Sequence, residues 1–388
     1  MGTAAQAGGG FAAELKGNSL GVGMTDGMYR IGIVGAASLK GKELADELED
    51  SLLAASDIVL FDDEDATGQV TSVGDEAALI HRVEAGSFER MDFVFFAGDA
   101  EDTRAHWQAA RRIGASIVDL TYELEGERGV LVRAPLIREL SPMSQKRDMG
   151  HPQPRMGPNL ETAAVVAAHP AAVMLALVAA RVQGRIPVEN LAATVVEPAS
   201  EHGREAMDEL HQQTVNLLSF QNLPRDQYDA QVAFNLLPSL GVSSKVKLGA
   251  TEERIGRHYT QLGGGRLPPL DLELVQAPVF HGYVASVLLE LAEERTALEV
   301  ETALEGESID VVAEESDPPS NLSAAGQEDV MVRVRGGGSE AGSRGSRAGA
   351  ASRRFWLWLA ADNLKLSALN AIACANELRR LRPRGKVQ

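Results

Sequence analysis

The chain has 388 residues, about two to three times the length of an ordinary single domain, and therefore predicts two domains. Its hydrophobic content of 44% is that of a globular protein with a substantial core. The formal net charge of −18 argues against general nucleic-acid binding, and the single cysteine, Cys374, excludes an intramolecular disulfide framework and any cysteine-based metal site.

The N-terminal segment and one apolar stretch bear on compartment. Residues 1–28 are rich in glycine and alanine and lack the features of a secretory signal, so we expect a flexible tail. The stretch 162–180 holds no Asp, Glu, Lys or Arg, but His169 and Pro170 interrupt it. A buried strand, a turn and a buried helix explain this stretch better than a membrane span. The sequence thus predicts a cytoplasmic protein without a membrane partner.

The first half of the chain alternates short apolar runs with amphipathic helical patterns. Strands are predicted at 29–35, 57–61, 92–98 and 115–119, and helices at 39–53 and 102–113. Apolar strands that alternate with helices indicate α/β architecture, with a parallel sheet covered on both faces. We therefore expect a Rossmann-type, doubly wound dinucleotide-binding domain over residues 29–160.

The second half has the pattern of an α+β domain, expected over residues 161–354. Strands are predicted at 190–197, 231–237, 270–280 and 329–334, and helices at 203–219, 284–304 and 361–380. The acidic stretch 288–317 is expected to be a solvated helix face and loop. Residues 336–352 are of low complexity, which predicts a disordered loop.

The turn after the first predicted strand has the spacing of a phosphate-binding loop. Gly35 ends the strand, Ala37, Ser38 and Leu39 present backbone amides at the start of the helix, and Gly41 allows helix and strand to pack closely. These residues are predicted to bind a dinucleotide. A tight β–α connection that binds no ligand has the same spacing, and this alternative stays open.

Asp62 ends the second predicted strand, where an acidic side chain meets the adenosine ribose hydroxyls in dinucleotide-binding domains. The acidic run 62–65 would repel a 2′-phosphate, so NAD is favoured over NADP as the cofactor. A solvated turn is the alternative interpretation of the same run.

Several segments together resemble the aspartate-semialdehyde dehydrogenase family. In the family's order, from about residue 29 to 380, they read GIVGAASLKG, DFVFFAGDAEDTRAHWQAARRIGASIVD, PASEHGREAMDELHQQ, VAFNLLPSL, QAPVFHGYV and FWLWLAADNLKLSALNAIACANEL. Within this family the pattern is similar to the Usg-like branch, which lacks the catalytic cysteine. The resemblance implies a dinucleotide-binding domain completed by the C-terminal helix within 355–388. It also implies a semialdehyde-dehydrogenase-type dimerisation domain that forms a homodimer.

The resemblance can be followed residue by residue through the family's chemistry, which begins with attack of a cysteine thiolate on the aldehyde. It places this nucleophile at Ala172, the arginine that holds the substrate carboxylate at Gln276, and the histidine base at Tyr283. Cys374 falls in the segment that matches the closing helix and cannot replace the nucleophile. These replacements predict a pseudoenzyme, a homodimer of NAD(P)-binding type without semialdehyde dehydrogenase activity.

Three further motifs of the family are altered. Its Glu-Glu-x-Lys motif falls on 252–255, with Ile255 in place of the lysine. Glu197 stands where a neutral residue meets the anionic substrate, and the phosphate loop after the fourth strand is not recognisable in 119–123. These differences point to the same loss of activity.

Two alternative functions stay open. One is an active NAD(P)-dependent oxidoreductase on aspartate semialdehyde or a related aldehyde of amino-acid biosynthesis, acting through Tyr283 or through His281, which is expected on the same strand face. The other is an interaction protein without a ligand, in which the Ser38 side chain closes the phosphate turn. No metal site is predicted, because the spacing of His202 and His211 does not place them on one helix face.

Overall fold

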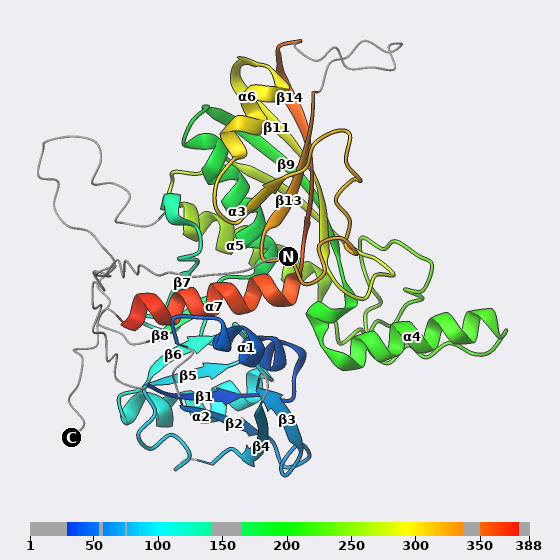
Figure 1. The fold of residues 1–388 in the computed structure, drawn as a ribbon. Coiled ribbons are helices and arrows are strands. Elements are labelled where there is room, and N and C mark those ends of the chain that lie inside the picture. The colour runs from blue at the N-terminus through cyan, green and yellow to red at the C-terminus, as the bar shows by residue number, and fades with distance from the viewer. Residues whose placement is uncertain are drawn as a thin grey trace, which may run out of the picture. The chain divides into compact units, whose positions relative to one another are not determined.

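The structure is a computed structural model that describes residues 29–53, 57–73, 76–84, 86–140, 164–336 and 350–379. Two sheets organise this part of the chain, one of eight strands and one of six (Figure 1). The predicted tail, most of the predicted disordered loop and the predicted boundary between residues 160 and 161 lie outside the described residues. No helix in the described ranges is long and apolar enough to cross a membrane.

The eight-stranded sheet has the order β3-β4-β2-β1-β5-β6-β8-β7, and all neighbours are parallel except β3 and β4. Its strands are β1 (Arg30–Val34), β2 (Asp57–Asp62), β3 (Val70–Val73), β4 (Glu76–Arg82), β5 (Phe93–Phe96), β6 (Ser116–Asp119), β7 (Leu131–Arg133) and β8 (Ala164–Ala167). The strand order reverses between β1 and β5, the switch point at which such sheets bind ligands. The predicted doubly wound architecture is confirmed.

Helices cover both faces of this sheet. On one face α1 (Leu39–Glu49) and α7 (Asn363–Arg379) pack against Phe93 and Phe95 of β5. On the other face α2 (Ala100–Arg112) packs with Val94 and Phe96 of the same strand. Because side chains alternate along a strand, a strand buried on both sides reads as a continuous apolar run. This is why the sequence FVFF predicts the strand correctly.

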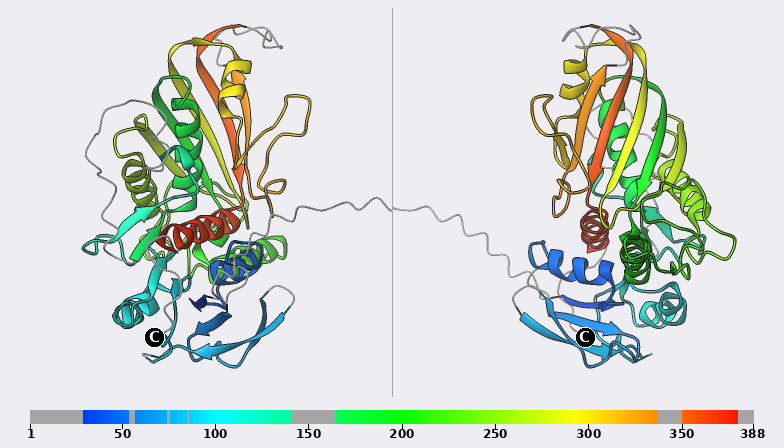
Figure 2. Two further views of the ribbon diagram at one scale, coloured as in Figure 1. Left: turned by 60° about the vertical axis from the view of Figure 1, so that its left-hand side comes forward. Right: turned by 90° about the vertical axis from the view of Figure 1, so that its right-hand side faces the viewer.

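The six-stranded sheet has the order β10-β9-β11-β14-β13-β12. Its strands are β9 (Val188–Glu197), β10 (Leu270–Gln276), β11 (Tyr283–Arg295), β12 (Ile309–Val311), β13 (Val330–Gly336) and β14 (Ser352–Ala361). The remaining helices are α3 (Pro170–Gln183), α4 (Arg204–Leu218), α5 (Leu248–Gly263) and α6 (Ala297–Leu304), with short 3-10 turns η1 (Arg138–Leu140) and η3 (Ala199–His202). One face of the sheet packs against α3, α5 and α6 (Figure 2).

Two of the elements predicted for the second half are of the wrong type. The sequence predicts a helix over 284–304, whereas the structure has β11 followed by α6. Pairing of β11 with β9 and β14 buries alternate side chains and overrides the helix propensity of a Leu-, Ala- and Glu-rich segment. Residues 231–237 form turns with a single bridge from Leu237 to Gln276, because this segment packs onto α4 and not into a sheet.

The predicted strand 270–280 is shorter than expected and ends at Gln276. His281 lies in the loop before β11, and Gly282 between it and Tyr283 has a φ of +85°. The extended backbone is broken at this glycine. The expectation that His281 and Tyr283 share one strand face is therefore wrong.

Candidate functional site

The glycine-rich turn between β1 and α1 is a close approach of backbone segments. Gly35 has a φ of +83°, and a Cβ added to it would lie 2.2 Å from the Cα of Gly98 at the end of β5. A Cβ on Gly41 would lie 2.1 Å from the carbonyl oxygen of Gly35. Only glycine fits at these positions, so packing accounts for them with or without a bound nucleotide.

Ser38 joins this turn to the neighbouring strand. Its Oγ accepts the backbone N–H of Gly41 at 2.9 Å and thereby caps α1. The same hydroxyl donates to the carbonyl oxygen of Ala97 at 2.9 Å. The serine side chain thus satisfies one of the amides that open the helix.

Asp62, at the end of β2, bonds to the same turn. Its Oδ2 accepts the backbone N–H of Ala37 at 2.6 Å. Among the hydrogen bonds of the described residues, none uses the N–H of Leu39 or Lys40. These two amides at the positive end of the α1 dipole are the ones that stay available to an anion.

A cavity of about 280 Å³ lies beside this turn, at the switch point of the sheet. The residues that precede four helices line it, namely Ser38, Asp99, His169 and Gly203 for α1, α2, α3 and α4. Positive helix ends therefore converge on one small space. Such convergence favours a ligand with negative charge.

Lys40 and Glu201 form an ion pair across this cavity. The ammonium of Lys40, in the first turn of α1, lies 2.9 Å from the carboxylate of Glu201 in η3, and the two side chains are 14% and 3% exposed. Burial alone would lower the pKa of Lys40, but the Glu201 carboxylate raises it above its usual range. Burial likewise opposes the charge of Glu201, yet Lys40 lowers its pKa to about 2. Both groups are ionised at neutral pH.

Tyr122 follows β6 and lies beside this pair. Its φ of +68° is in the left-handed region, which is costly for an aromatic residue. The Lys40 ammonium and the Arg254 guanidinium lie over its ring, 4.9 and 4.8 Å from the centroid. Its hydroxyl accepts from Lys40 at 3.3 Å, and burial raises the pKa of Tyr122, so the phenol stays neutral.

His169 caps the N-terminus of α3, the helix predicted from the 162–180 stretch. Its Nδ1 accepts the N–H of Ala171 at 3.3 Å, and its ring stacks on Tyr122 with centroids 5.5 Å apart. Burial lowers the pKa of His169 to about 3, so the imidazole is neutral. Its backbone N–H donates to Nδ1 of His258 at 2.9 Å. The helix N-terminus is thus closed by a neutral ring.

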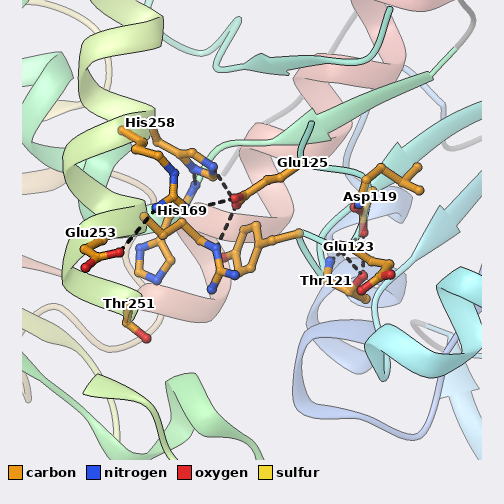
Figure 3. A network of polar contacts seen from close by, with 12 residues as sticks. Asp119, Thr121, Glu123, Glu125, His169, Thr251, Glu253 and His258 are labelled. Atoms are coloured by element: carbon orange, nitrogen blue, oxygen red, sulfur yellow. Dashed lines mark hydrogen bonds and ion pairs between the residues drawn. The ribbon is translucent and has the colours of Figure 1, made fainter. Parts of the chain in front are cut away.

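Glu125 is hydrogen-bonded to His258 within a network of polar contacts (Figure 3). Its carboxylate binds Nε2 of His258 at 2.8 Å and the guanidinium groups of Arg254 and Arg257 at 2.7 and 3.0 Å. Burial alone would raise the pKa of Glu125, but these partners lower it to about 2. Arg254 is therefore held over Tyr122 by a charged partner.

The structure places each of the three positions that the resemblance assigns to catalysis. Gln276 pairs with Glu197 where β10 and β9 end, and β11 begins beside them with Tyr283. The Tyr283 ring lies 6.1 Å from that of His169. Ala172 is wholly buried in the first turn of α3. Gln276 and Tyr283 thus lie at the same end of the six-stranded sheet, and Ala172 lies in the helix that His169 precedes.

The buried polar groups at this end of the sheet are only partly hydrogen-bonded, because the Tyr283 hydroxyl, Gln276 Oε1 and Glu197 Oε1 have no hydrogen-bond partner among the described residues. Burial and the neighbouring carboxylates of Glu201 and Glu197 raise the pKa of Tyr283 well above its usual value, so it is a poor general base. The Nε2 of Gln276 donates to the carbonyl oxygen of Glu197 at 3.2 Å. The Glu197 carboxylate lies 2.9 Å from Nε2 of His202. Among the described residues, no arginine is a hydrogen-bond partner of the Gln276 side chain.

Cys374 lies in α7, within the core of the eight-stranded sheet. Its Sγ contacts the carbonyl oxygen of Arg133 at 3.7 Å. Burial raises the pKa of this thiol, which keeps it protonated. The buried structural thiol predicted from the sequence is therefore found.

Sequence reasoning missed the roles of Lys40, Tyr122 and Arg254. Arg254 precedes Ile255, the position where the resemblance expects a lysine, and Ile255 is wholly buried in the core. The sequence carries no signal for these roles, because the burial of Glu201 that requires a nearby cation is seen only in the structure. Within the described ranges, no group of three or more His, Cys, Asp or Glu side chains is arranged to hold a metal ion.

Comparison with known proteins identifies this architecture. The family model for the NAD-binding domain of semialdehyde dehydrogenases matches residues 30–139, and the model for their dimerisation domain matches residues 180–342. The chain therefore belongs to the semialdehyde dehydrogenase family.

Individual relatives cover nearly the whole chain. A USG-1 protein homolog of Pseudomonas aeruginosa is 30% identical over 345 residues, which is 88% of this chain and 95% of the relative. An aspartate-semialdehyde dehydrogenase of Rickettsia bellii is 24% identical to this chain, and the match covers 90% of this chain and 97% of the relative. The solved structure of a probable aspartate-semialdehyde dehydrogenase from Pseudomonas aeruginosa superposes with a TM-score of 0.75 at 27% identity, covering 91% of this chain and 99% of that one.

Proposed function

We propose that this protein is a homodimeric, nucleotide-binding member of the family that does not oxidise semialdehydes. One observation carries the proposal: α3 begins with Pro170, Ala171 and Ala172, and the only thiol of the chain is buried elsewhere in α7. Without sulfur no thioester intermediate can form, and loss of the nucleophile alone costs several orders of magnitude in rate.

Charge at the turn favours a nucleotide without a 2′-phosphate. Asp62 and Asp63 follow one another at the end of β2, and both act electrostatically on Asp99, which precedes α2. Burial and the nearby Asp62 and Asp63 carboxylates raise the pKa of Asp99. A further phosphate here would add to this repulsion, which supports NAD over NADP as the nucleotide.

The experiment is an assay and a titration on the same purified protein. We expect no formation of reduced nucleotide when the protein is incubated with aspartate semialdehyde, phosphate and either NAD or NADP. Calorimetric titration with the nucleotide alone should show heat of binding. Turnover that depends on phosphate would refute the loss of activity.

A protein that binds no nucleotide is the second candidate. It is favoured by Ser38 and Asp62, which already bond the Gly41 and Ala37 amides of the turn. Absence of heat with adenine nucleotides up to about millimolar concentration, a free energy weaker than about −4 kcal/mol, would select this candidate.

The open face of the six-stranded sheet supports the homodimer. One row of paired residues crosses this face, Asp271–Ala192–Leu288–Trp356–Arg335. The row is acidic at β10, apolar in the middle and basic at β13, and its tryptophan is 39% exposed. A two-fold axis parallel to the strands would set the acidic end of one copy over the basic end of the other. The face is thus self-complementary in charge and apolar at its centre.

A further inference from the structure

The route of a dinucleotide through this fold leads across the cavity. In doubly wound sheets the diphosphate lies at the N-terminus of the first helix, and the two nucleoside halves lie on either side of the switch point. Asp62 marks the adenosine side, next to β1. The other side is lined by Ala97, Gly98, Leu120 and Tyr122, which are all cavity residues. A nicotinamide half would have to enter this space.

The Lys40–Glu201 pair occupies that side of the switch point. Glu201 is held by three elements, because it binds Lys40 of α1 at 2.9 Å, Nδ2 of Asn363 of α7 at 3.4 Å and approaches Nε2 of His169 at 3.5 Å. Lys40 is held in turn by Glu201 and by the Tyr122 hydroxyl. A ligand entering here must displace a charge that has partners on several elements.

Stability alone is a weak explanation for this arrangement. Removing two charges from water costs several kcal/mol per ion, so a buried pair contributes little net stability and is better explained by specificity. Tyr122 adds a left-handed aromatic residue at the same place, and such strain is maintained where it positions a side chain. The Lys40–Glu201 pair and Tyr122 line the same cavity.

The cavity leaves little room on this side of the switch point. Its volume of about 280 Å³ lies just below the range for small-molecule sites, about 300–1,000 Å³. We propose that the site takes an adenosine diphosphate group and excludes the nicotinamide half, because the Lys40–Glu201 pair and Tyr122 narrow the space on that side of the switch point. This inference rests on the proposed nucleotide binding and narrows the ligand class to adenosine diphosphates without a base on the second ribose.

ADP-ribose and NAD test this directly, because they differ only by the nicotinamide. In calorimetric titrations of the wild-type dimer, ADP-ribose should bind at least about tenfold more tightly than NAD, which is about 1.4 kcal/mol. The double variant Lys40→Met/Glu201→Gln removes both charges together and leaves no unpaired ion. In this variant the two dissociation constants should converge to within about threefold.

A matched control is the pair between Lys365 of α7 and Glu47 of α1, which is similarly shielded but lies outside the cavity. Lys365→Met/Glu47→Gln should keep the wild-type preference for ADP-ribose, and thermal melts should show both double variants folded. Wild-type protein that binds NAD as tightly as ADP-ribose would overturn the inference while leaving nucleotide binding intact. No binding of either compound to any of the three proteins would instead refute the proposed nucleotide binding, and the inference with it.

Discussion

The Asp62 carboxylate and the Ala37 N–H are hydrogen-bonded at 2.6 Å, across 25 positions of sequence. The acidic side chain at the end of β2 therefore lies directly on the glycine-rich turn. Its negative charge and the diphosphate of a nucleotide would share the same small region. If the proposed nucleotide binds here, we expect its preference for or against a 2′-phosphate to depend on the charge of this one residue.

Asp62→Asn should relax discrimination against a 2′-phosphate. Asparagine keeps an oxygen that accepts the Ala37 N–H but removes the repulsion. The affinity for 2′-phospho-ADP-ribose relative to ADP-ribose should rise about tenfold in calorimetric titrations. The control is Asp65→Asn, an exposed acid of the same turn, which should change the ratio much less. Equal ratios in wild type and Asp62→Asn would contradict the assignment of Asp62.

The Lys40–Glu201 pair should make stability depend on acid pH. The pKa of Glu201 is about 2 in the folded protein and near 4.3 when unfolded, so the carboxylate stabilises the fold above the unfolded pKa and this contribution is lost as pH falls toward the folded pKa. Between about pH 6 and about pH 3, the free energy of unfolding measured in urea should fall for wild type by on the order of 2 kcal/mol more than it falls for Lys40→Met/Glu201→Gln. Parallel pH curves for the two proteins would argue against an ionised, shielded Glu201.

Gly41→Ala should destabilise the protein strongly through the backbone. A Cβ at this position would lie 2.1 Å from a carbonyl oxygen that cannot move aside cheaply. We expect a loss of about 3 kcal/mol in the free energy of unfolding, measured in urea. Gly249→Ala, in α5 with no heavy atom within 4 Å of the added Cβ, should change it by less than about 0.5 kcal/mol. Similar small effects at both positions would show that the close approach is absent.

Trp356→Glu should dissociate the homodimer. The substitution places a charge at the apolar centre of the row that crosses the open sheet face. Sedimentation should show a shift from dimer to monomer at micromolar concentration. Leu52→Glu, on an apolar side chain that is 75% exposed after α1, is the control and should stay dimeric. A dimer that survives Trp356→Glu unchanged would place the interface elsewhere.

Most of the first sheet could be predicted from the sequence because its strands are buried on both faces. DIVLF and FVFF have no other plausible state, and β2 and β5 lie where they predict. The strands β3 and β4 were missed because their sequences, VTSV and EAALIHR, mix polar and apolar residues at the sheet edge. For β11 the residue types favour a helix, and only pairing with its neighbours decides the outcome.

The site was predictable only where its residues are close in sequence. The turn from Gly35 to Gly41 is contiguous, so its geometry follows from local spacing. Lys40 and Glu201 are 161 positions apart, and no local pattern joins them. Tyr122 gave no signal either, because a left-handed backbone conformation leaves no mark in the type of an aromatic residue. Tertiary folding alone brings these three side chains together.

The return of α7 to the first sheet has a consequence for synthesis of the chain. The inner face of β1 and β5 is covered in part by Ala371, Ile372, Ala375 and Leu378 of α7. A ribosome completes these residues only after every strand of both sheets. The nascent N-terminal sheet thus keeps part of this apolar face uncovered until α7 has been synthesised, so this packing step follows synthesis of all the strands.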